Sequence, residues 1–217
     1  MLDTSKIYSS NNYGDFKIVN YINANHVEID FIATGFKAIT EAGNIRRGEV
    51  KDRLHPNVCG VGFIGEGEYG RNSKPYKTWR GVLERCYCPK YQKKRPTYIG
   101  VTVCNDWHNF QNFAKWFEDN YIEGFHIDKD IKQRGVKNKV YGPNTCKFVS
   151  QKDNNIEASA KNYRMRDPSG VVHVIYNLSE FARKNGLSKE CLYAVNSRKS
   201  KHHKGWTKDY QECRATN

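Results

Sequence analysis

The stretch His126-Ile-Asp-Lys-Asp130 is followed by a loop rich in Lys, Gly and Asn, then by Tyr141-Gly-Pro-Asn-Thr-Cys-Lys-Phe-Val-Ser150 and Asn154. Its short apolar runs predict one strand that ends at Asp128, a second over 146–149, and a helix with Ser150 as N-cap. Asp128 and Asn154 would then converge. A carboxylate and an amide oxygen so placed can hold one hard divalent ion and leave positions open for phosphate and water. The stretch therefore predicts a metal site that hydrolyses phosphodiesters.

The composition favours a folded protein with a polyanionic partner. The 217 residues are 38% hydrophobic and 13% aromatic, which is enough for hydrophobic cores. Lys and Arg number 36 against 23 Asp and Glu, for a net charge of +13 and a pI near 9.4. We expect nucleic acid as the partner, and a basic surface that is merely solvated is the alternative.

No segment predicts an association with a membrane or an oxidising compartment. No apolar run approaches the roughly 20 residues that span a bilayer, and the N-terminus lacks a signal-peptide pattern. We therefore expect no membrane contact and a cytoplasmic location. The seven cysteines are odd in number and irregularly spaced, which favours reduced thiols; they are Cys59, Cys86, Cys88, Cys104, Cys146, Cys191 and Cys213.

Zinc is not expected. The close pair Cys86-Tyr-Cys88 has a one-residue gap, shorter than the gap that zinc sites favour, and no partner pair follows it. Burial as free thiols is the better account of Cys104 and Cys146.

The overall pattern predicts an α+β protein of three domains. Residues 1–70 alternate with period two on both sides of a turn at 23–25, and a third strand edge is expected from Ile45, so we predict a small antiparallel, barrel-like β domain. This domain would either contact DNA through Lys37, Arg46 and Arg47 or serve as a packing platform.

Residues 71–160 are predicted to form a ββα-metal nuclease domain with flanking helices. Trp79, Leu83 and Cys86 share one face of a helix, and apolar residues recur at helical spacing from Trp107 to Phe117. Both stripes are interpreted as core. Residues 101–104 are strand-like.

Residues 161–217 are predicted to be a helix-turn-helix DNA-binding module. A hairpin with its turn at 167–170 comes first, followed by two short helices, the second capped by Ser188, and then by a run of basic residues. The second helix would read bases and the basic run would contact phosphates. The predicted DNA-binding residues are Lys189, Tyr193, Asn196, Arg198, Lys199, Lys201 and Lys204.

Taken together, these motifs resemble phage-encoded homing endonucleases of the HNH type. The residues that carry the resemblance are Trp79, Arg85-Cys86, Val103-Cys104, Trp107, Phe110, Phe113, Ile127-Asp-Lys-Asp-Ile131, Tyr141-Gly-Pro-Asn-Thr-Cys146 and Asn154. The segment from Asn177 to Trp206 resembles the modular DNA-binding repeat often attached to such nucleases.

The resemblance implies a site-specific DNA endonuclease that uses one Mg²⁺ or Mn²⁺ ion. Its partner would be double-stranded DNA, bound as a monomer, in the cytoplasm of an infected bacterial host. Asp128 would be the first metal ligand and Asn154 the second. Asn155 would be a neighbour rather than a ligand.

Two positions depart from the family pattern. Many relatives have a histidine after the acidic ligand as general base, where this chain has Lys129, a cation suited to stabilising a transition state. His126 is a possible substitute base, and Asp130 would either share the metal or pair with Lys132.

The second departure concerns the Asn that usually supports the loop between the strands. Its place is taken by Thr145, with Asn144 one residue earlier. These departures support an alternative function, a catalytically inactive, nuclease-derived DNA-binding or regulatory protein. A weaker third possibility is an RNA-binding protein.

Overall fold

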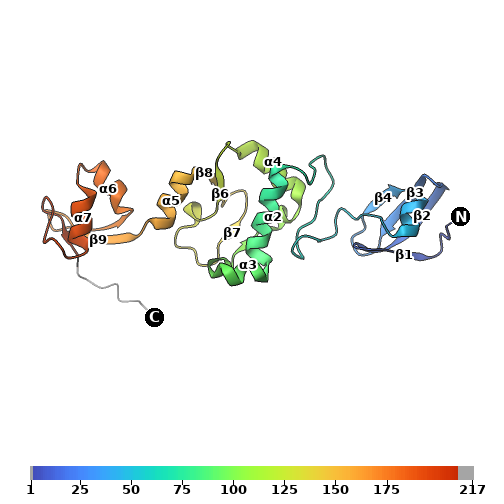
Figure 1. Cartoon of the computed structure of the whole chain (residues 1–217), viewed down its shortest axis with the longest axis horizontal. Helices are drawn as coiled ribbons and strands as arrows, with labels where there is room; N and C mark the ends of the chain where they lie inside the picture. The colour runs from blue at the N-terminus through green and yellow to red at the C-terminus, as the bar shows by residue number, and fades with distance from the viewer. Residues whose placement is uncertain (1, 210–217) are drawn as a thin grey trace. The chain divides into compact units, whose positions relative to one another are not determined.

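The computed structural model describes residues 2–209, except for the side chains of 158 and 159, and confirms the predicted α+β class (Figure 1). The chain divides into two compact units, residues 1–148 and 149–217. The buried hydrophobic side chains of the described residues form three clusters. Ile64 belongs to the central cluster, and the partly buried Val58 packs against it. The predicted domain boundaries stay predictions.

The N-terminal part is a four-stranded antiparallel sheet in the order β1-β2-β3-β4. Phe16 and Ile18 are buried whereas Lys17 and Val19 are exposed, so the predicted alternation places one sheet face in the core. The strands are β1 (Ile7–Ser10), β2 (Gly14–Asn23), β3 (His26–Phe31) and β4 (Lys37–Thr40).

Two predictions for this part are wrong. The sheet is open rather than barrel-like, because β1 and β4 are its edges and four strands are too few to close a barrel. The expected strand edge from Ile45 is instead the helix α1 (Ala42–Arg47). Ala42 and Ile45, three residues apart, are both buried, and Gly48 ends the helix in the left-handed conformation at φ 67°.

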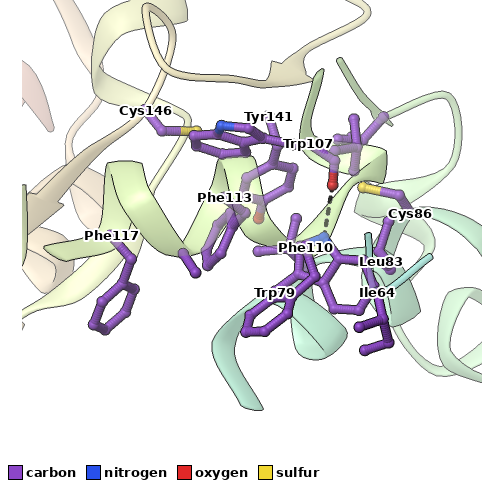
Figure 2. Close-up of a cluster of buried hydrophobic side chains, with 14 residues drawn as sticks. Ile64, Trp79, Leu83, Cys86, Trp107, Phe110, Phe113, Phe117, Tyr141 and Cys146 are labelled. Atoms are coloured by element: carbon purple, nitrogen blue, oxygen red, sulfur yellow. Dashed lines mark hydrogen bonds between the residues drawn. The ribbon is translucent and has the colours of Figure 1, made fainter. Parts of the chain in front are cut away.

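The central part packs two helices through aromatic side chains, as predicted (Figure 2). Ser73 caps α2 by accepting a hydrogen bond from the Tyr76 backbone N–H. Trp79 is fully buried on α2, and its Nε1 donates to the Trp107 carbonyl at 2.6 Å. The helices are α2 (Lys74–Tyr87), α3 (Pro89–Lys94), η1 (Pro96–Tyr98), η2 (Asn105–His108), α4 (Phe110–Asn120) and η3 (Ile131–Gln133).

Short strands of the central part pair two by two and so hold its loops together. β5 (Thr102–Val103) pairs in parallel with β7 (Val140–Tyr141). β6 (His126–Asp128) pairs with β8 (Lys147–Val149), so the two strands expected beside Asp128 are present and adjacent.

The second unit contains the elements that the sequence indicated from Ser150 onward. Ser150 caps α5 (Gln151–Ser159) by accepting from the Asp153 N–H at 3.1 Å. A three-stranded sheet of order β10-β9-β11 follows, together with two short helices. These elements are β9 (Asn162–Arg166), β10 (Val172–Tyr176), α6 (Leu178–Lys184), α7 (Lys189–Asn196) and β11 (Thr207–Lys208).

None of the helices formed by the described residues combines the length and the apolar composition that crossing a bilayer requires.

Candidate functional site

Asp128 ends β6 and is buried, with 6% of its surface exposed. Its Oδ1 accepts hydrogen bonds from the backbone N–H groups of Asp130 at 3.0 Å and Ile131 at 2.9 Å, which turns the chain into η3. Among the described residues, no donor bonds Oδ2. No fully buried side-chain polar atom of these residues lacks a partner, so Oδ2 keeps some contact with solvent. One oxygen of this carboxylate therefore holds the turn and the other can bind a ligand.

A buried glutamine that we did not predict secures the loop behind Asp128. Gln133 Nε2 donates to the carbonyl oxygens of Lys129 at 2.8 Å and Val140 at 2.9 Å, while its Oε1 accepts from the Val140 N–H at 2.9 Å. The Thr145 hydroxyl donates to Val140 O at 2.6 Å and to Gly142 O at 3.2 Å. Gln133 and Thr145 thus supply the loop support that the sequence assigned to Asn144 or Thr145. Asn144 itself is exposed.

Lys129 points into a cage rather than to the surface. Its side chain is 7% exposed, and Nζ lies 2.9 Å from Asp130 Oδ2, 5.0 Å from the centre of the Tyr98 ring and 5.7 Å from that of Tyr141. This ammonium is engaged by one carboxylate and two aromatic faces.

Asp130 is shared between two lysines. Besides Lys129, the Lys139 ammonium donates to Asp130 Oδ1, and these two take the place that the sequence suggested for Lys132. Burial raises the pKa of the Asp130 carboxyl, but the hydrogen bonds from Lys139 and Lys129 outweigh it and hold the pKa below its usual value. Metal binding by Asp130 would have to displace these ion pairs.

The thiols nearest this cage are inert. Burial raises the pKa of Cys86 to about 12, and it raises the pKa of Cys146 to about 12 as well, so both stay protonated near neutral pH. Cys104 is half-buried, and Cys213 lies outside the described residues.

The remaining predicted residues of the site are on separate elements. His126 begins β6 and is exposed, whereas Asp128 two residues later is buried. Asn154 belongs to α5 in the second unit and is half-buried, with its backbone N–H bonded to Ser150 O at 3.0 Å. Asn155, beside it, is exposed and accepts a hydrogen bond from Gln151.

The donor set suits a hard cation. Carboxylate and amide oxygens are ligands that Mg²⁺ and Mn²⁺ prefer, and such ions keep several waters. The described residues contain no group of three or more His, Cys, Asp or Glu side chains that could hold a metal. A metal here would thus be bound by few protein ligands, with Asp128 Oδ2 as one of them.

The second unit has its own candidate surface. A groove of about 440 Å³ runs beside α7, and the predicted residues Tyr193, Asn196 and Lys199 line it. Tyr163, which we did not predict, stacks edge-on against Tyr193 with ring centres 5.7 Å apart. Lys161 and Glu190 also line the groove. Tyr163 and Lys161 come from β9 and the residues before it, so α7 alone could not reveal them.

The predicted phosphate contacts differ in how free they are. Lys199 and Lys201 are exposed, as is Lys189, whose Nζ lies 3.7 Å from Glu190. Lys204 Nζ donates to the Gly186 carbonyl at 3.0 Å, so it also ties the loop between α6 and α7. Arg198 is exposed, with a left-handed backbone at φ 64°.

No protein-family model matches the chain, and no curated protein matches it. A solved structure described as "DNA binding and cleavage by the HNH homing endonuclease I-HmuI" is similar over 96% of this chain and 90% of that one. The sequence identity is 13% and the TM-score is 0.23. A likeness at this level carries no conclusion about this chain.

Proposed function

We propose that the protein is a metal-dependent DNA endonuclease of the homing type. The observation that carries the proposal is the carboxylate of Asp128, buried at the end of β6, fixed through Oδ1 and open through Oδ2. An oxygen that the fold leaves without a hydrogen-bond donor is available to coordinate a hard divalent cation.

In this proposal each residue of the site has a limited role. Asp128, in the first unit, binds Mg²⁺ or Mn²⁺ through Oδ2, and the role of Asn154, on α5 of the second unit, stays a prediction. The bound ion would polarise a phosphate oxygen and lower the pKa of a bound water. The two backbone N–H bonds to Oδ1 hold the carboxylate in one orientation. His126, exposed on the same strand, is the candidate base that accepts a proton from water.

Lys129 and Asp130 have a positioning role. Their ion pair lies directly after Asp128, in the turn that Asp128 Oδ1 closes. Lys129 therefore stabilises the end of β6 and would not contact the phosphate.

DNA binding in the proposal rests on the basic charge and on the groove of the second unit. Asn196 and Tyr193 would contact bases, and Lys199, Lys201 and Lys204 would contact phosphates. The helix-turn-helix and the site specificity are part of the same proposal.

A second candidate function is favoured by one observation. The ammonium of Lys129 is caged at the position where the sequence pattern expects a catalytic histidine. A chain that lost its base could still bind DNA, and the protein would then act by occupying its target.

Cleavage of supercoiled plasmid by the purified protein, with Mg²⁺, with Mn²⁺ and with chelator, separates these functions. The nuclease proposal predicts nicks or breaks that need the metal and that are lost in Asn154→Ala. Salt-sensitive binding without cleavage in either metal would instead establish the inactive DNA-binding protein.

A further inference from the structure

Two segments that flank the Asp128 turn are rich in cations and contain no acidic residue. Residues 85–105 hold five Lys and Arg, and residues 131–148 hold another five, with no Asp or Glu in either segment. Such runs are usually solvated surface. The position of each cationic side chain in the fold shows whether it can contact a partner.

The two segments are joined to each other in the first unit. β5 and β7 pair in parallel, with Thr102 opposite Val140 and Val103 opposite Tyr141. The Cys104 N–H donates to Tyr141 O at 2.8 Å. Their cations therefore belong to one structure, although 25 residues separate the segments.

The inner cations are already in use. Lys129 and Lys139 pair with Asp130. Arg85 is half-buried, where burial lowers its pKa but the neighbouring tyrosines Tyr141, Tyr98 and Tyr91 together more than offset this. These side chains hold the fold together and are not free for a ligand.

Six outer cations are exposed, and none forms an ion pair within the described residues. They are Lys90, Lys93, Lys94 and Arg95 on and after α3, and Lys132 and Lys137 in the loop after β6. We call these six residues the outer basic surface.

The helix α3, which carries three of these cations and is followed by a fourth, Arg95, is attached to the site. α3 has two half-buried residues: the Tyr91 ring lies 5.8 Å from Tyr98, and Gln92 Nε2 donates to Cys86 O. The Lys129 ammonium in turn lies 5.0 Å from the centre of the Tyr98 ring, and Lys129 directly follows Asp128 in the chain. The contacts between Tyr91 and Tyr98 and between Tyr98 and Lys129 thus connect α3 to the end of β6.

We propose that the outer basic surface binds the phosphate backbone of duplex DNA beside Asp128. The proposal rests on the endonuclease function, since an enzyme that cuts DNA must hold the polyanionic strand beside its site, and exposed cations attract that strand. This surface acts in addition to the groove of the second unit. It holds the strand to be cut, whereas the groove selects the sequence.

The test measures binding of a 30-base-pair duplex in chelator, so that the result does not depend on cleavage. The variant K90Q/K93Q/K94Q/R95Q is compared, in the full chain, with K6Q/K17Q/K37Q/K51Q, which removes four exposed lysines of the N-terminal part. Because both variants lose four positive charges, a difference in DNA binding between them reports lost contacts rather than a change in the overall electrostatic field of the protein.

The α3 variant should flatten the slope of log K against log salt by about 3 to 4, at about 0.9 for each lost phosphate contact. The N-terminal variant should stay within about 1 of the wild type. A second variant, K132Q/K137Q, should flatten the slope by about 2. This variant tests the loop after β6, so the proposal can still be judged if the α3 variant does not fold.

The outcomes are distinguishable. Equal slopes for the α3, loop and N-terminal variants, beside a steep wild type that cleaves DNA, would overturn the proposed surface and leave the nuclease standing. A wild type without salt-dependent binding would overturn both.

Discussion

Asp52 in the N-terminal part and Asp128 in the central part are both buried aspartates that turn the chain, at 2% and 6% exposure. Asp52 Oδ1 accepts from the Leu54 N–H at 2.7 Å, and its Oδ2 accepts from the Thr34 hydroxyl at 2.6 Å. Asp128 uses only Oδ1 in this way. The difference separates a carboxylate with both oxygens bonded within the fold from one whose second oxygen is bonded by no described residue.

The N-terminal part and the rest of the chain also differ in charge. Residues 1–70 hold 7 Lys and Arg against 9 Asp and Glu, whereas residues 71–217 hold 29 against 14. Of the two roles that the sequence left open for the N-terminal part, this balance favours the packing platform. Arg47, one of the residues considered for DNA contact, is paired with Glu49 at 2.7 Å.

Replacing the two aspartates gives the largest expected effect. Asp128→Asn keeps an acceptor for the turn but weakens metal binding, so we expect cleavage to fall on the order of 10³-fold with the fold retained. Asp52→Asn should cost about 1 kcal/mol of stability and leave cleavage by the folded protein unchanged. Plasmid cleavage, beside urea unfolding, measures both. Equal cleavage by the Asp128 and Asp52 variants would show that the two aspartates do not differ in their importance for cleavage.

Two buried glutamines extend the comparison. Gln111 bonds Ile64 O, Tyr69 O and the Tyr69 N–H, and Gln133 makes the same three kinds of bond in the loop behind Asp128. Each Gln→Leu change strands buried backbone groups and should cost about 2 to 4 kcal/mol in urea unfolding. Only the change at Gln133 should also slow cleavage, by about tenfold, measured where both variants are folded. A similar loss of cleavage from Gln111→Leu would show that general loosening is the cause.

The ion pairs of Asp130 make a prediction about pH. Asp130→Asn leaves the buried Lys129 ammonium without its carboxylate and should cost about 1 to 3 kcal/mol at pH 7. The folded-state pKa of Asp130 is lowered, so its contribution is complete above the ordinary carboxyl pKa and is lost as pH falls through the folded value. Urea midpoints of wild type and variant should therefore converge below pH 4. Asp119→Asn, at an exposed carboxylate, should match the wild type throughout.

Local patterns in the sequence were enough for the strands beside Asp128 and for the helix that Ser150 caps. A cap residue and a short apolar run act on neighbours in the chain, so their effect can be predicted from the sequence. The buried stripe of Trp79, Leu83 and Cys86 followed from helical spacing in the same way. α1 was missed because its six residues are too short for a period to show.

The support of the site depends on partners that the sequence does not mark. Gln133 bonds backbone atoms at 129 and 140, and any residue type could occupy those positions. The cage of Lys129 needs Tyr98, which lies 31 residues earlier and reaches it only through the fold. The sequence suggested that Lys129 is a cation suited to stabilising a transition state, whereas tertiary packing buries its side chain against Asp130 and two tyrosine rings.

The smallest expected effects concern the recognition of DNA sequence by the second unit, compared with the slightly acidic N-terminal part. Asn196 lines the groove beside Tyr193, so Asn196→Ala should lose about tenfold in discrimination between target and random duplex, whereas Lys199→Ala should weaken both alike. Lys37→Ala, an exposed lysine of the N-terminal part, is the matched control and should change neither. Competition binding at fixed salt measures all three. If Asn196→Ala weakened both duplexes equally, the groove would hold the backbone only, and sequence selection would have to come from another surface.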